Sequence, residues 1–235
     1  MASDSHAAFV PQNPFVISYL GLRKAVGIIG FCLPFVLVFG KMLFQGGGLQ
    51  SSISRYYYTD MRDVFVGSMC SIGIFLMSCR GFDRRDEIAG RFSCAFALGV
   101  ALCPTTPDGN TSAVVKFIGA LHLCFAALLF LTLAFFCICL FTETHPGRKP
   151  AGRKKQRNNV YLTCGYAMIG CIVLLGVVNI PFINPLVARF NPVFWLEAVA
   201  VIAFGFAWLT KGETILKDET IQERPPDDAR GATAR

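Results

Sequence analysis

The sequence is poor in charged residues. Only 16% of its 235 residues are Asp, Glu, Lys or Arg, whereas 54% are hydrophobic. A soluble domain carries about 25% charged residues, so this composition excludes an ordinary water-soluble protein. Several apolar runs approach the roughly 20 residues that a membrane-spanning helix needs. The chain is therefore predicted to be an integral membrane protein, and the inner (plasma) membrane of a bacterium is the location we expect.

Motifs for metal or redox chemistry are also missing from the sequence. The ten cysteines never occur in a CxxC spacing, and of the three histidines only His122 lies in an apolar run. A zinc site needs several ligands, and one imidazole near the membrane supplies too few. We therefore expect no metal and no cofactor. Because there is no soluble basic domain, we also expect no nucleic-acid partner.

Six apolar runs are candidates for membrane spans. They lie near residues 25–44, 64–80, 88–103, 114–141, 160–180 and 193–210. Backbone polar groups in lipid must be satisfied within each segment, and the alternation that marks a membrane β-barrel is absent. The sequence thus predicts an all-α membrane protein, a six-transmembrane-helix bundle over residues 25–210. Residues 1–24 are predicted to lie at the membrane interface, and residues 211–235 to form a polar, disordered tail.

The basic residues predict how the bundle is oriented. The segment 143–158, ETHPGRKPAGRKKQRN, carries six Lys or Arg residues and one acid, whereas PTTPDGNTS at 104–112 has no basic residue. Basic loops stay on the cytoplasmic side, so both termini and 143–158 are predicted to be cytoplasmic. There the basic loop is expected to bind anionic lipid headgroups. Residues 51–63, 104–112 and 179–192 are then expected to face outward.

Three ionisable residues stand in or beside the apolar runs. Asp63 begins the second run, His122 lies in the fourth and Glu197 lies in the sixth, shortly after an Asn191-Pro192 pair that is typical of a helix start. An ionisable group at the centre of a membrane helix costs about 2.5–3.5 kcal/mol, so each needs a reason. A structural role is open for all three: a helix cap for Asp63, and pairing between helices for the other two.

The stretch SSISRYYYTDMRD, residues 51–63, places further polar groups at the same predicted membrane face. Together these residues predict an outward-opening polar pocket between spans two, four and six. Its predicted ligand-binding residues are Arg55, Tyr58, Arg62, Asp63, His122 and Glu197. The three tyrosines also suit an aromatic belt at headgroup level. Adjacent helical residues point about 100° apart, so we expect at least one tyrosine to turn inward, and the arginines to hold an anionic headgroup.

One segment resembles a known family. In residues 101–136, Gly119, His122, Ala126 and Phe130 follow the pattern Gly-x-x-His-x-x-x-Ala-x-x-x-Phe, after a Pro-Thr turn in which Thr106 stands where an acid is usual. Together with residues 51–75, this segment resembles the bacterial membrane proteins of domain-of-unknown-function family 998. That family has a distant likeness to the DRAM and GPI-lipid-remodelling membrane proteins. The resemblance implies a compact six-span bundle, a role for His122 and lipid handling, but no reaction.

Three functions follow from these patterns. The leading prediction is a non-enzymatic protein that binds a lipid or small amphipathic ligand, with transport of that ligand as an extension. The alternative is a membrane-embedded lipid hydrolase or transferase that uses His122, a carboxylate such as Asp63, and Ser71 as nucleophile. A further alternative is a proton-coupled carrier or pore in which Glu197 titrates. The sequence is also compatible with a homo-oligomer.

Overall fold

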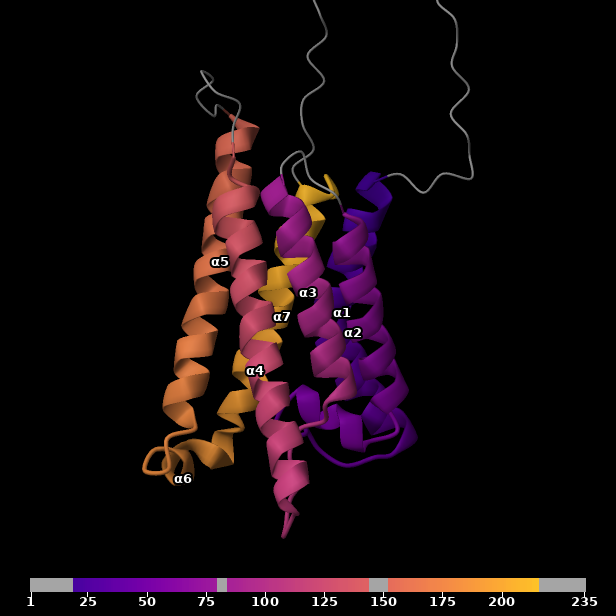
Figure 1. Cartoon of the computed structure of the whole chain (residues 1–235), viewed down its shortest axis with the longest axis vertical. Helices are drawn as coiled ribbons and strands as arrows, with labels where there is room; N and C mark the ends of the chain where they lie inside the picture. The colour runs from indigo at the N-terminus through magenta and orange to yellow at the C-terminus, as the bar shows by residue number, and fades with distance from the viewer. Residues whose placement is uncertain (1–18, 80–83, 144–151, 216–235) are drawn as a thin grey trace, which may run out of the picture.

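The computed structural model describes residues 19–79, 84–143 and 152–215, and over these ranges the regular secondary structure is entirely helical (Figure 1). The six long helices are α1 (Tyr19–Phe44), α2 (Arg62–Ser78), α3 (Arg84–Leu102), α4 (Ala113–Phe135), α5 (Arg153–Val178) and α7 (Pro192–Lys211). The short elements are the 3-10 helices η1 (Ser54–Tyr58) and η3 (Ala188–Phe190), the π-helical turn η2 (Phe136–Leu140) that extends α4, and helix α6 (Asn184–Val187).

Each predicted span coincides with one long helix. Four of these helices are long and apolar enough to cross a membrane, namely α1, α4 together with η2, α5 and α7. Large apolar side chains also cover the outside of the molecule. Leu43, Phe117 and Val173 are between 60% and 77% exposed. A helix that is apolar all round is either buried in a large protein or embedded in lipid, so these helices are suited to a membrane.

Several helices begin earlier than the apolar runs do. Helix α1 begins at Tyr19, inside the segment predicted to be interfacial, and α5 begins at Arg153, inside the predicted basic loop. Helix α3 begins at Arg84, in a charged stretch that was expected to be a loop. The prediction was wrong at these ends because helical hydrogen bonds do not need apolar side chains and continue past the lipid. The rest of the interfacial segment (1–18), half of the basic loop (144–151) and most of the tail (216–235) lie outside the described residues.

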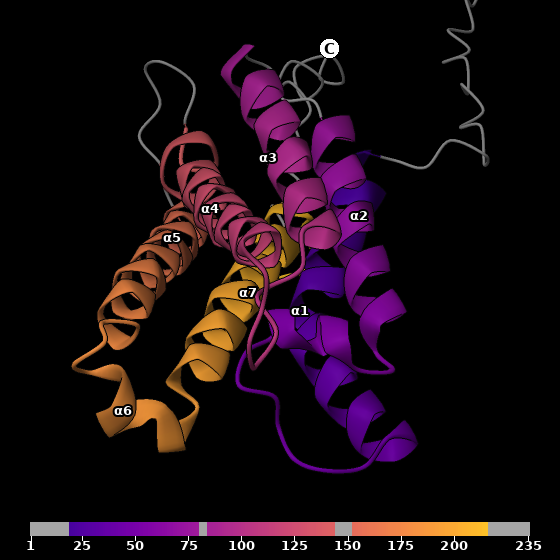
Figure 2. The ribbon, with the colours of Figure 1, turned by 60° about the horizontal axis from the view of Figure 1, so that its bottom comes forward.

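The six long helices close into a ring. Around it each helix packs against the next, in the order α1, α2, α3, α4, α5, α7 and back to α1 (Figure 2). The first turn of α1 and the last turn of α7 lie at one end of the ring, which we call the terminal end (Figure 1). At the opposite end, the η1 end, lie η1, the α3–α4 connection (residues 103–112) and α6.

Glycines let α1 and α7 approach each other closely. A Cβ atom on Gly205 would lie 2.3 Å from the backbone nitrogen of Phe31 and 2.9 Å from the carbonyl oxygen of Gly27. Only a hydrogen fits in that space. Membrane helices associate through close packing at small residues rather than through the hydrophobic effect, and this seam joins the first and last helices of the ring.

Aromatic side chains fill the ring near the terminal end. We call this cluster the aromatic plug, and it consists of Phe136, Phe141, Tyr161, Phe204 and Trp208. The ring centroids of Phe136 and Phe141 lie 5.7 and 5.2 Å from that of Trp208, which is only 1% exposed. These separations suit edge-to-face packing. The plug joins η2, α5 and α7 and leaves little empty space at this end.

Candidate functional site

A cavity of about 810 Å³ lies inside the ring and reaches the η1 end. All six long helices contribute to its wall, and α4 and α5 move apart toward this end (Figures 1 and 2). Phe204 lines the cavity and also packs on Trp208 at a centroid distance of 6.2 Å, so the aromatic plug forms its floor. The volume falls within the range of about 300–1,000 Å³ that is typical of ligand sites.

The cavity wall has an apolar part and a polar part. The apolar part includes Phe65, Met69, Ile72, Leu129, Leu133, Leu175 and Val201. The polar part lies toward the η1 end and includes Ser51, Ser52, Ser54, Arg55, Thr105, Thr106, Asp108, Asn179, Asn184, Asn191 and Glu197. A ligand that fits both parts must itself be amphipathic, because a polar wall group left without a partner costs free energy.

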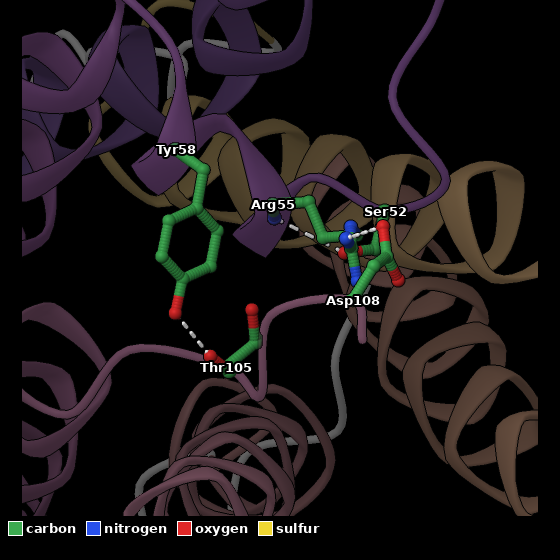
Figure 3. A network of polar contacts seen from close by, with 5 residues as sticks. All are labelled: Ser52, Arg55, Tyr58, Thr105 and Asp108. Carbon is green, nitrogen blue, oxygen red and sulfur yellow. Dashed lines mark hydrogen bonds and ion pairs between the residues drawn. The ribbon is translucent and has the colours of Figure 1, made fainter. Parts of the chain in front are cut away.

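Hydrogen bonds tie η1 to two segments that are distant in sequence. The Ser54 backbone N–H donates to Glu197 Oε2 at 3.1 Å, which attaches η1 to α7. On the other side, Arg55 forms an ion pair with Asp108, and the Tyr58 hydroxyl donates to the Thr105 carbonyl oxygen (Figure 3). These contacts make η1 a polar bridge between α7 and the α3–α4 connection, beside the cavity.

Local sequence explains why residues 51–58 fold in this way. The Ser52 hydroxyl accepts a hydrogen bond from the Arg55 backbone N–H at 3.1 Å, which satisfies a donor at the start of the helical turn (Figure 3). The three consecutive tyrosines then point in different directions. Tyr56 is fully buried, Tyr57 is half-buried and Tyr58 is 43% exposed. The inward residue that we expected is therefore Tyr56, whereas Tyr58 faces outward.

His122 supports the cavity rim from behind. Its Nδ1 atom lies 2.6 Å from the Cys103 carbonyl oxygen at the end of α3. A carbonyl oxygen only accepts, so Nδ1 carries the hydrogen in this contact. One turn earlier on α4, a Cβ atom on Gly119 would lie 2.8 Å from the Thr106 backbone nitrogen. His122 and Gly119 thus hold the turn that carries the Tyr58 and Arg55 partners.

The structure places only two of the six predicted ligand-binding residues, Arg55 and Glu197, on the cavity wall. His122 is 1% exposed and packs behind the wall, because its ring is held against the end of α3. Arg62 is exposed and donates to the Tyr57 hydroxyl at 2.7 Å, with its guanidinium 4.4 Å from the centre of that ring. Asp63 is exposed, and the N-cap position of α2 is held by Met61.

The catalytic alternative is not assembled in this structure. Asp63 and Ser71 lie eight residues apart on α2, which is about 12 Å along a helix. Asp63 is exposed, whereas His122 is buried against the α3 terminus. Within residues 19–79, 84–143 and 152–215, no three His, Cys, Asp or Glu side chains gather as a metal ion would require.

Several polar residues of the wall were not singled out from the sequence. Asp108 is the acid that pairs with Arg55, and Asn179, Asn184 and Asn191 line the cavity from the α5–α7 side. A signal was available for each. Asp108 is the one acid in the 104–112 loop, and the three asparagines fall in residues 179–192, which were predicted to share its membrane face. Their partners come from distant segments, which a local pattern does not reveal.

Comparisons with protein-family models, with curated proteins and with solved structures find no match to this chain. The resemblance to family 998 therefore stays a prediction, and the cavity is the basis for a function.

Proposed function

We propose that this protein binds a lipid or small amphipathic molecule within its helical ring, with the apolar part of the ligand inside the ring and its polar part at the η1 end. The observation that carries this proposal is the two-part wall of the 810 Å³ cavity. Apolar residues of α2, α4 and α7 surround its depth, and hydroxyl, amide and charged groups surround its η1 side. A membrane-facing ring with such a cavity suits a ligand that comes from the bilayer.

We also propose that all six long helices span the membrane and that the terminal end is cytoplasmic. Helix α2 has only 17 residues and α3 begins with charged residues, but both are needed to close the ring. Arg23, Lys24 and Lys211 lie on the terminal turns of α1 and α7, and Arg153 to Lys155 lie on the first turn of α5. This excess of basic residues supports a cytoplasmic terminal end. The η1 end, with the mouth of the cavity, then faces the opposite side.

The contacts of the ionisable wall groups support ligand binding rather than catalysis. Arg55 is paired with Asp108, and the Glu197 carboxylate accepts a backbone hydrogen bond from η1. Nucleophilic catalysis requires a nucleophile within hydrogen-bonding reach of a base. Among the described wall residues no hydrogen bond joins a serine or threonine hydroxyl to an imidazole, and His122 lies behind the wall.

A substitution that fills the cavity tests the proposal. Ala126 lines the cavity on α4, so Ala126→Phe should displace the ligand while the helix stays folded. Ala120 on the same helix is exposed, and Ala120→Phe is the matched control. Protein purified in a mild non-ionic detergent should carry a bound amphiphile in native mass spectrometry. We expect that mass to be lost in Ala126→Phe and kept in Ala120→Phe. Equal occupancy in both variants would contradict the proposal.

A further inference from the structure

The ionisable groups on the cavity wall include one acidic group without a basic partner. They are Arg55, Asp108 and Glu197, and the first two form an ion pair with each other. Glu197 accepts a hydrogen bond from the Ser54 backbone N–H at 3.1 Å, which is a neutral donor. Over the described parts of the chain, no salt bridge involves Glu197. The carboxylate thus faces the cavity without a cation.

Two amides on the cavity wall also offer oxygen acceptors to a ligand. Asn179 donates from Nδ2 to the Leu175 carbonyl oxygen at 2.7 Å, and Asn184 donates from Nδ2 to the Val178 carbonyl oxygen at 3.3 Å. Both residues line the cavity. Each Nδ2 atom uses one of its two N–H donors in these bonds, and each Oδ1 atom can still accept from a ligand. The polar part of the wall therefore offers the Glu197 carboxyl group and amide oxygens as acceptors.

We propose that the cavity selects an amphipathic ligand whose polar end is a protonated amine, which pairs with Glu197 and donates to acceptors on the polar part of the wall. This inference rests on the proposed function and names the chemical class of its ligand. An ammonium group carries three hydrogen-bond donors and a positive charge, which matches the wall in both respects. This cationic ligand has the opposite charge to the anionic headgroup that we expected the arginines to hold. Arg55 is already paired, and Arg62 stacks on Tyr57.

The depth of Glu197 fits an amine that enters with its chain inside the ring. Glu197 is five residues after Pro192, the first residue of α7, or about 8 Å along the helix. Val201, one turn further on, and Phe204 continue the wall as apolar surface. A bound amine at Glu197 would thus leave the alkyl chain next to Val201 and Phe204. A charge that deep is costly without a partner, and the ligand would supply one.

The test compares probes that share one alkyl chain. Dodecylamine, N-acetyl-dodecylamine, dodecanol and dodecanoate are titrated into wild-type protein in nanodiscs of phosphatidylcholine, with binding followed by native mass spectrometry. We expect dodecylamine to bind about tenfold tighter than the two neutral probes, because charge-assisted hydrogen bonds are stronger, and dodecanoate to bind most weakly. Lysophosphatidylethanolamine and lysophosphatidylglycerol then separate a lipid amine from a simple alkylamine. Equal binding of amine and neutral probes would overturn the inference, as would tighter binding of dodecanoate.

Variants assign the preference to Glu197. Glu197→Gln keeps an oxygen that can accept from Ser54 and removes the charge, so dodecylamine should then bind no more tightly than dodecanol. Asp60→Asn removes an exposed carboxylate from the same end and is the matched control, expected to keep the preference. Val193→Lys, one turn before Glu197 on the cavity wall, should also abolish it by supplying an internal cation. A persistent amine preference in both Glu197→Gln and Val193→Lys would overturn the inference. Failure of every probe to bind wild type would instead overturn the proposed function.

Discussion

The two ends of the helical ring are closed by different kinds of contact. At the terminal end the aromatic plug fills the interior, and α1 and α7 meet with backbone against backbone at Gly205. At the η1 end α4 and α5 move apart, and polar loops are joined across the cavity by hydrogen bonds and one ion pair. The same six helices are therefore densely packed at one end and hollow at the other.

Because of this difference, we expect the terminal end of the ring to contribute most of the stability and the η1 end to contribute ligand binding. Dense packing of large side chains makes many short-range contacts that are lost together. A rim of hydrogen-bonded loops gives less stabilisation, since each bond contributes about 0.5–1.5 kcal/mol, but it can rearrange around a ligand. We therefore expect substitutions at the terminal end to lower stability and substitutions at the η1 end to alter the cavity.

The largest effect is expected in the aromatic plug. Trp208→Ala removes a buried indole that contacts three other rings, and a truncation of this kind costs about 3–5 kcal/mol in the free energy of unfolding. Phe130→Ala, at the cavity wall, should cost clearly less because one side of that ring already faces open space. Thermal unfolding in detergent micelles, followed by helical circular dichroism, measures both. Equal losses would show that the two ends do not differ in packing.

The seam between α1 and α7 should give the next largest effect. Gly205→Ala places a Cβ atom 2.3 Å from the Phe31 backbone nitrogen. Backbone cannot move aside as a side chain does, so we expect a loss near the top of the usual range of about 1–3 kcal/mol for overpacking.

Gly170→Ala is the matched control for this seam. Gly170 lies inside α5, and no atom lies within 4 Å of a Cβ atom placed there. Alanine is the better helix former by about 1 kcal/mol, so this variant should keep or slightly gain stability in the same unfolding assay. A Gly205→Ala protein as stable as Gly170→Ala would refute the close approach of α1 and α7.

A smaller effect is expected at the support of the cavity rim. His122→Leu keeps an apolar side chain of similar size and removes the donor to the Cys103 carbonyl oxygen. An unsatisfied buried carbonyl costs about 1–3 kcal/mol, and the lower half of that range is expected because the turn lies near the membrane surface. The more specific result is local. Amide hydrogen exchange of residues 103–112 should accelerate, while exchange in the aromatic plug should not change.

Thr132→Val is the control for that experiment. Thr132 is also on α4, and its hydroxyl donates to the Leu128 carbonyl oxygen of its own helix at 2.7 Å. Its loss should leave exchange in residues 103–112 unchanged. If His122→Leu and Thr132→Val gave the same exchange pattern, His122 would have no special role in holding the turn.

Much of the helical framework could be predicted from hydropathy and local start signals. Helix α7 starts at Pro192, where the Asn191-Pro192 pair predicted it. Helix α4 starts at Ala113, one residue before the predicted span, after Ser112, whose side chain accepts from the Val115 N–H. The Asn191 side chain, however, makes no capping bond, because its backbone takes a left-handed conformation with φ 49°. The helix ends at Tyr19, Arg84 and Arg153 were misplaced, since hydropathy reports the lipid boundary rather than the last hydrogen bond.

The site was less predictable, and His122 shows why. An imidazole in an apolar run indicates a buried polar contact, which is present. The partner, however, is a backbone carbonyl. Every residue has one, so the sequence does not show which carbonyl the imidazole contacts. Arg55 likewise looked available for an anion until Asp108, 53 residues away, was placed beside it. The sequence gives the type of each side chain, but whether that side chain is free or paired depends on which segments the fold brings together.

The sequence by itself determined that this chain forms long apolar helices, because each segment must satisfy its own backbone hydrogen bonds and present apolar side chains to lipid. Those requirements act within one segment and can be read from about 20 residues. The tertiary structure alone decided the order of helices around the ring, the cavity at its η1 end and the meeting of Glu197 with Ser54 across 143 residues of sequence. These depend on how helix faces pack, and packing is a property of pairs of surfaces rather than of either sequence segment.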